Sequence, residues 1–214
     1  MNFVRLIIFV SAIFTVPICY AVERSSVYSK IPDRVVINPL NLFSDSQQTE
    51  IRDKLQEINA NGYLSVPEEA LEEFLPDVLQ KKLEDSHLYT SRQHLNWILD
   101  DSSFKKQEME FLGFLYGGER ISARIFSDKN KNIYKLIELN ITKTRNVVMP
   151  GPLINHSVDG YPAIFMILKD PSGKVKSTLS WNDNSRGYIL EMNGEFPREK
   201  STDNYLVKIA NQLY

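Results

Sequence analysis

Residues 158–192 read VDGYPAIFMILKDPSGKVKSTLSWNDNSRGYILEM, and this stretch decides the fold class. Three turn signals divide it: Val158-Asp159-Gly160, 170–173 and 182–187. The runs between the turns are rich in β-branched and aromatic residues, which favour strands. These strands are predicted over residues 161–168, 175–181 and 188–192. Short turns join antiparallel neighbours, so the stretch predicts a sheet built from successive hairpins.

The alternating pattern extends toward the N-terminus as far as about residue 108. Apolar residues from Met109 to Leu115 lead to Gly117-Gly118, and Ile121, Ala123 and Ile125 then alternate with polar residues, which predicts a hairpin. Further strands are predicted over 133–141 and 153–157, with a loop over 142–151. Together these segments predict an antiparallel meander of about six or seven strands.

Helical signals flank the predicted sheet on both sides. Residues 44–60 predict a helix, with Ser44 or Asp45 as its cap and Asn61-Gly62 as its stop. Ser65-Val66-Pro67-Glu68 predicts the start of a second helix, capped by Ser65. Pro76 interrupts that helix, and further helices are predicted over 77–83 and from Thr90 or Ser91 to Leu99. A C-terminal helix is predicted from 201–203 onward, with an apolar stripe of Leu206, Ile209, Ala210 and Leu213.

Runs of helices beside runs of strands predict an α+β fold in which the C-terminal helix packs on the sheet. We divide the chain into a signal peptide (1–21), a lead-in segment (22–43), a helical part (44–107) and an antiparallel sheet plus C-terminal helix (108–214). The lead-in contains a short predicted strand, Arg34–Ile37. The last two parts are expected to form one compact domain.

The first 21 residues have the three-part layout of a cleavable signal peptide. Arg5 precedes an apolar run that ends at Pro17, and Cys19-Tyr20-Ala21 places small residues at the positions that signal peptidase requires. We predict cleavage after Ala21. The alternatives are an uncleaved anchor, although the apolar run is shorter than the roughly 20 residues that span a bilayer, and a lipoprotein modified at Cys19. No apolar stretch after the signal is long enough to cross a membrane.

Cleavage would remove Cys19, the only cysteine of the chain. The mature protein would then have no disulfide, no thiol nucleophile and no cysteine metal site. Small secreted animal domains often depend on disulfides, so an exported chain without cysteine favours a bacterial periplasm.

Charge is distributed unevenly along the chain. Residues 44–110 contain 15 acidic and 7 basic residues, whereas residues 111–214 contain 10 acidic and 14 basic residues. Glu68, Glu69, Glu72 and Glu73 concentrate negative charge at the start of the second predicted helix. Two interpretations stay open: a solvated helix face, or a docking surface for a protein partner with a basic surface.

No catalytic or cofactor motif stands out. The three histidines His87, His94 and His156 lack the spacing of a metal centre, so we expect no metal. The segment 155–159 contains His156, Ser157 and Asp159, but neighbours in a strand point to opposite faces, so we interpret it as a surface turn rather than a triad. There is no phosphate-binding glycine loop, and we expect neither a cofactor nor nucleic-acid binding.

The C-terminal 55 residues resemble a group of small exported bacterial domains. The resemblance rests on Gly160-Tyr161-Pro162-Ala163, on the strand that ends at Trp181, on Gly187-Tyr188-Ile189-Leu190 and on the closing helix 206–213. Distant relatives of this kind include lipoprotein-carrier-like and sigma-factor-regulator periplasmic domains, which have an open curved sheet. The resemblance implies an exported sheet-plus-helix domain and assigns no functional residue, because the matched positions are of core type.

These observations favour a non-enzymatic periplasmic binding protein, such as an immunity protein that neutralises the toxin of a secretion system. The alternative is a carrier or sensor of a hydrophobic ligand, a lipid or lipoprotein, on a curved sheet. A hydrolase is a third hypothesis, disfavoured by the few histidines and the loss of cysteine.

Overall fold

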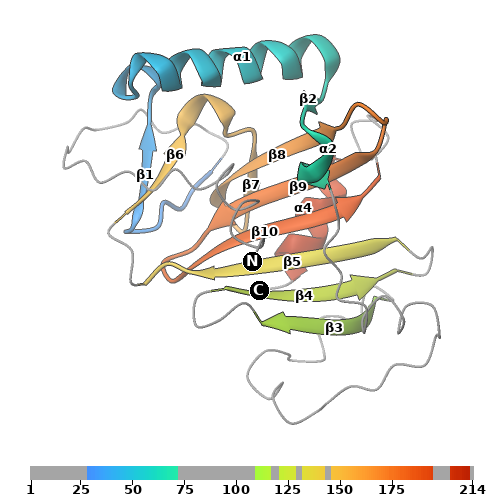
Figure 1. Ribbon diagram of the computed structural model, residues 1–214. Helices are drawn as coiled ribbons and strands as arrows, with labels where there is room; N and C mark the ends of the chain where they lie inside the picture. The colour runs from blue at the N-terminus through green and yellow to red at the C-terminus, as the bar shows by residue number, and fades with distance from the viewer. Residues whose placement is uncertain are drawn as a thin grey trace.

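The computed structural model describes residues 28–71, 109–116, 121–128, 132–142, 146–194 and 203–212. These residues form mostly sheet with a few helices, which confirms the α+β class (Figure 1). The elements in chain order are β1 (Val35–Asn38), η2 (Leu40–Leu42), α1 (Asp45–Asn61), β2 (Leu64–Ser65), α2 (Glu68–Leu71), β3 (Glu110–Tyr116), β4 (Ile121–Ser127), β5 (Ile133–Asn140), β6 (Val147–Pro150), η4 (Gly151–Leu153), β7 (His156–Val158), β8 (Tyr161–Lys169), β9 (Val175–Asn182), β10 (Arg186–Asn193) and α4 (Asp203–Gln212).

The main sheet has eight strands in the order β2-β8-β9-β10-β5-β4-β3, with β7 also paired to β8. It consists of two three-stranded meanders, β3-β4-β5 and β8-β9-β10, that are joined by antiparallel pairing of β5 with β10. The prediction of one purely antiparallel meander is therefore wrong in detail. The sheet is mixed, because β2 runs parallel to β8. These two strands lie about a hundred residues apart in the chain. The residue pattern within one strand does not indicate which distant segment pairs with it.

The turns of the C-terminal meander lie where the sequence predicts them. Asp159 and Gly160 have φ angles of 46° and 82° between the paired residues Val158 and Tyr161. Positive φ at both central residues is the geometry that suits a two-residue hairpin turn, which explains an Asp-Gly pair at this position. The next turn carries Gly173 at a φ of 88°.

A second, two-stranded sheet pairs β1 with β6 in parallel. The loop predicted over residues 142–151 is therefore wrong in part, because Val147–Pro150 form a strand. Its partner strand lies in the lead-in segment, where the short strand predicted near Arg34 is confirmed as β1. Tyr28, Val35 and Ile37 pack with Met149 and Ile164 on one face of the main sheet.

The helix α1 has the predicted caps. The backbone N–H of Ser44 donates to Gln47 Oε1 at 3.0 Å, and Gly62 ends the helix at a φ of 77° with its N–H bonded to Ile58 O. The side chain of Ile51 is buried. Figure 1 shows α1 running along the β8 side of the sheet, where it contacts β2 and η4.

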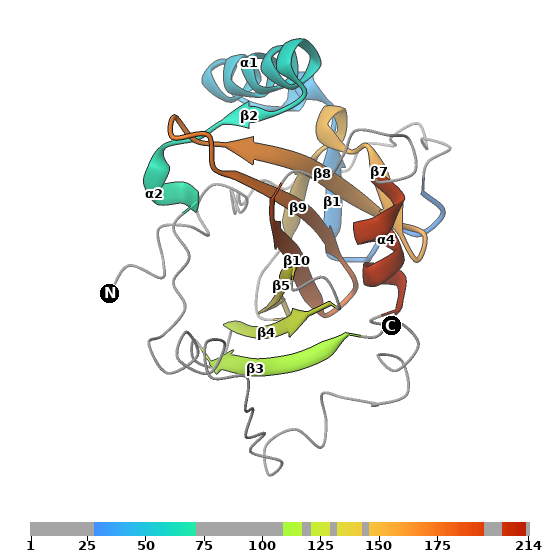
Figure 2. The same ribbon diagram turned by 90° about the vertical axis from the view of Figure 1, so that its right-hand side faces the viewer.

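The face of the main sheet that lies opposite β1 and β6 holds the larger core cluster and the short helix α4 (Figure 2). Leu206, Ile209 and Ala210 are at most 2% exposed and confirm the predicted apolar stripe as far as the structure describes it. They share one cluster with side chains from both meanders: Phe126, Tyr134 and Leu136 from one, and Ala163, Phe165, Ile167, Leu179, Trp181, Leu190 and Met192 from the other. The C-terminal helix thus packs on the sheet, as predicted.

Several predictions concern residues that the structure does not describe. They are the signal peptide 1–21, the helices over 77–83 and 90–99, the turn at Gly117-Gly118, and the end of the helical stripe at Leu213.

Candidate functional site

The described part of the predicted acidic surface lies in α2. Glu68 and Glu69 form the first turn of this helix, and both are exposed. Neither makes a hydrogen bond or an ion pair with any residue that the structure describes. Glu72 and Glu73, the other two residues of this prediction, lie outside the described residues. Two exposed carboxylates with no partner among the described residues therefore lie at this surface.

The strand β2 holds α2 against the edge of the sheet. Leu64 and Ser65 pair with the end of β8, and the N–H of Val66 donates to Lys169 O at 2.9 Å. The ammonium of Lys169 lies over the ring of Tyr63, 5.0 Å from its centroid, rather than against a glutamate. β2 thus fixes the position of α2, and Lys169 at the neighbouring end of β8 does not pair with Glu68 or Glu69.

The predicted capping role of Ser65 is wrong. Ser65 belongs to β2, and its N–H donates to Glu57 Oε1 at 2.7 Å. It lies three residues before the first helical residue, Glu68, whereas a capping residue directly precedes the helix. The serine contributes to the edge pairing that positions α2 instead of starting the helix.

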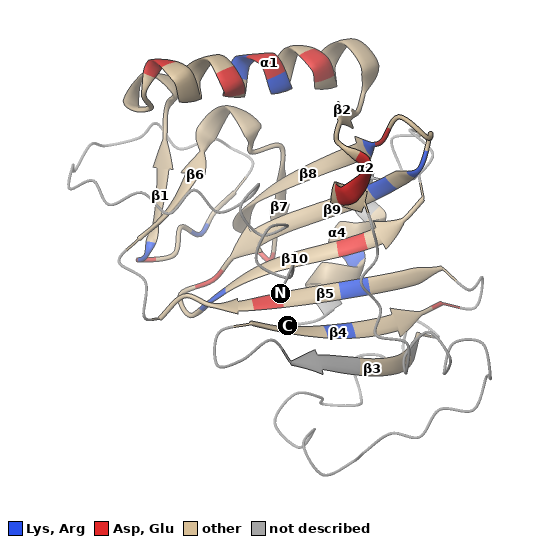
Figure 3. Ribbon diagram, in the orientation of Figure 1, with Lys and Arg blue, Asp and Glu red and all other residues tan. Residues whose placement is uncertain are grey.

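Further acidic residues lie on α1. We call residues 44–71 the acidic helical segment, because they contain six acidic and two basic residues, a net charge of −4. Figure 3 shows red segments along α1 and on α2. Glu50 pairs with Lys54 one helical turn away, whereas Asp45 and Asp53 are exposed. The segment thus has a net negative field, which favours approach of a cationic surface.

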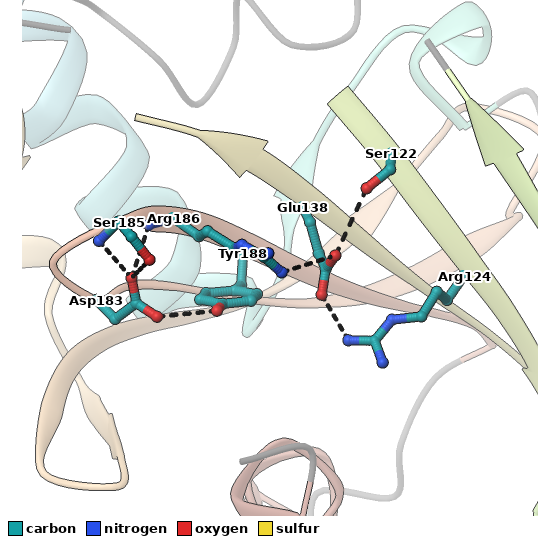
Figure 4. A network of polar contacts seen from close by, with 7 residues as sticks. All are labelled: Ser122, Arg124, Glu138, Asp183, Ser185, Arg186 and Tyr188. Carbon is teal, nitrogen blue, oxygen red and sulfur yellow. Dashed lines mark hydrogen bonds and ion pairs between the residues drawn. The ribbon is translucent and has the colours of Figure 1, made fainter. Parts of the chain in front are cut away.

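A buried ionic cluster on the α4 face of the sheet was not predicted from the sequence. Glu138 is 5% exposed and lies 2.5 Å from Arg124 and 3.4 Å from Arg186, with Ser122 at 3.5 Å (Figure 4). Arg124 is itself 6% exposed. Two arginines and a hydroxyl surround this carboxylate, so its charge lies beside opposite charges inside the fold.

The turn beside that cluster is built around Asp183. Its Oδ1 accepts the N–H groups of Ser185 and Arg186, both at 2.6 Å, and its Oδ2 accepts the Tyr188 hydroxyl at 2.9 Å (Figure 4). Burial alone would raise the pKa of Asp183, but these hydrogen bonds to the charged form outweigh it and lower the pKa below its ordinary value. The ring of Tyr188 stacks on Trp181 with centroids 5.0 Å apart, which connects the turn to the core.

A second ionic cluster lies on the other face of the sheet. Glu191 is the direct cross-strand partner of Lys135, and their charged atoms are 2.7 Å apart. Lys176, 2% exposed, lies 3.8 Å from the same carboxylate oxygen. Each face of the sheet therefore contains a glutamate between two basic residues. A clear sequence signal for either cluster is absent, because charged residues in alternating strands ordinarily point to solvent.

The histidine, serine and aspartate of residues 155–159 do not converge. His156 Nδ1 lies 2.8 Å from Asn155 Oδ1, and its ring contacts Phe165. Asp159 pairs with Lys30 at 2.8 Å, away from the histidine. Ser157 follows His156 in β7, so it points to the other face of the sheet. This geometry does not form a hydrolytic triad.

Within the described ranges, no group of three or more metal-ligating side chains could hold a metal ion, and no helix is long and apolar enough to cross a membrane. Comparisons with protein-family models, curated proteins and solved structures found no match.

Proposed function

We propose that this chain is an exported, non-enzymatic binding protein whose acidic helical segment docks a protein partner with a basic surface. The observation that carries the proposal is the pair of exposed carboxylates, Glu68 and Glu69, which no described residue neutralises. The buried acids Glu138 and Glu191 are by contrast committed to basic side chains inside the fold. Glu68 and Glu69 are thus accessible to a partner, whereas these buried acids are not.

The geometry makes this surface suited to electrostatic docking. α2 follows β2, which is hydrogen-bonded to the edge of a large sheet, so the backbone that carries these carboxylates needs little ordering when a partner binds. Charge complementarity of this kind mainly accelerates association and selects the partner, and salt screens it. A toxin with a basic surface is the partner that we propose, which would make the chain an immunity protein of the periplasm.

Charge reversal tests the docking surface. We expect Glu68→Lys and Glu69→Lys each to weaken binding of a partner recovered from periplasmic extract by roughly 1 kcal/mol, about fivefold in Kd, mainly through slower association. The loss should shrink in 0.5 M salt. Association and dissociation rates measured by surface plasmon resonance at two salt concentrations would separate these effects.

Asp33→Lys provides a matched control, because Asp33 is an exposed acid of the lead-in segment and its reversal changes the net charge equally. Equal losses for Asp33→Lys and Glu69→Lys would show a general charge effect and contradict docking at α2. Unchanged binding in both glutamate variants would also exclude this surface.

Growth protection tests the identity of the partner. Cells that express candidate toxins encoded beside this gene, directed to the periplasm, should survive when they also export the chain. Protection should be lost without the signal peptide, and mass spectrometry of the exported protein should find an N-terminus at Val22. Absence of both protection and a stable partner would contradict the immunity function, and an intact Met1 would favour the membrane-anchor alternative.

The carrier hypothesis requires an apolar sheet face that the rest of the chain leaves uncovered. In the described ranges the exposed large apolar side chains are Ile31 and Leu42, and neither belongs to the main sheet. Among the described residues, apolar side chains on both sheet faces belong to clusters of buried residues. We therefore favour protein binding over transport of a hydrophobic ligand.

A further inference from the structure

We draw no further inference here: the strongest candidate, the outer edge of strand β3 at the end of the main sheet opposite the β8 edge, carries nothing because the described part of the chain does not show what covers that edge.

Discussion

At the scale of single residues, Asn155 has a role that its position in a short polar segment does not suggest. The outer edge of β8 is paired with β7 at Tyr161–Ala163 and with β2 at Leu168–Lys169. Between these strands, the side chain of Asn155 accepts the N–H of Phe165 at 2.8 Å and donates to its carbonyl at 2.9 Å. The side-chain amide thus makes the two hydrogen bonds that a residue of a neighbouring strand would make. It pairs the backbone of Phe165 at a point of the edge where no strand lies beside β8.

Removal of this amide should destabilise the fold. Asn155→Ala leaves both backbone groups of Phe165 without their partner, and we expect the free energy of unfolding to fall by about 2 kcal/mol. Asn155→Asp keeps an acceptor for the N–H but places a carboxylate against the carbonyl, so it should not restore stability. Urea unfolding followed by circular dichroism would measure both changes.

Asn140→Ala is the matched control. Asn140 is exposed, and its side-chain oxygen accepts hydrogen bonds from the N–H and the hydroxyl of Thr142 within its own turn. Asn140→Ala should therefore lower the free energy of unfolding by less than Asn155→Ala does. Equal losses of stability in the two alanine variants would contradict a special role for Asn155 at the edge.

Asp183 should make the stability of the protein depend on pH. Its folded-state pKa is lowered, so its stabilising contribution is present above the unfolded-state value of about 3.9 and is lost as the pH falls through the folded-state pKa. Asp183→Asn should reduce stability at pH 7 by about 1 kcal/mol, because an amide accepts the hydrogen bonds of the turn less well than a carboxylate. The difference between the two proteins should shrink as the pH is lowered from 5 to 2. A constant difference over this range would contradict the role of the charged form.

At the scale of elements, the lead-in segment is fastened to two turns of the C-terminal meander. The N–H groups of Ser29 and Lys30 both donate to Gly160 O, at 2.9 and 2.8 Å. The N–H of Asp33 donates to Asn184 Oδ1 at 2.9 Å, in the turn between β9 and β10. The close approach at Gly160 depends on the missing side chain, because a Cβ atom there would lie 2.5 Å from Ser29 Oγ.

Gly160→Ala should therefore cost more stability than Gly173→Ala. Both glycines have positive φ angles, so each substitution carries a left-handed penalty of about 1 kcal/mol, but a Cβ at Gly173 would meet open space. The difference in stability loss between Gly160→Ala and Gly173→Ala therefore measures the effect of the close contact with the lead-in segment. Thermal unfolding of both proteins would measure it.

The double variant Ser29→Ala/Gly160→Ala tests the cause. Removal of the serine hydroxyl relieves the closest contact, so Gly160→Ala should cost about as much in this background as Gly173→Ala does alone. An undiminished cost would show that the penalty does not come from Ser29.

The elements that the sequence predicted well are those with local signals. Asp159-Gly160 fixes a hairpin through its own backbone conformation, and Ser44 and Gly62 fix the ends of α1 through hydrogen bonds within the helix. The strand β2 was missed because its two residues are too few to show alternation, and β6 was missed because Pro150 and Pro152 beside it indicate a loop. The acidic residues of the proposed site were visible as a charge cluster, whereas their attachment to the sheet edge depends on β2.

The ionic clusters show a similar limit at the scale of the whole molecule. Arg124 and Glu138 look like solvent-facing residues in alternating strands, but both are buried in the folded chain. Their burial depends on how the two meanders join and on what packs against each face. A sequence pattern identifies the faces of a strand, but it does not reveal that both faces are covered.

The helix α4 should make the two meanders unfold together. Leu206 is fully buried in a cluster with Tyr134 of one meander and Leu190 of the other, so Leu206→Ala removes packing that both share. We expect a loss of about 2–5 kcal/mol. In a Trp97→Phe background, fluorescence would report on Trp181 in the C-terminal meander, while far-UV circular dichroism would report on the whole sheet.

The two signals should change at the same urea concentration in the parent protein, and at one lower concentration in the Leu206→Ala variant, because a single cooperative unit loses its structure in one step. Lys208→Ala serves as the control, since Lys208 lies on the exposed side of the same helix and its substitution should leave both midpoints nearly unchanged. Separate midpoints for fluorescence and circular dichroism would show that α4 and the β5–β10 pairing do not couple the meanders. Coincident midpoints that shift together would show that the packing of α4 and the β5–β10 pairing belong to one cooperative unit that includes both halves of the sheet.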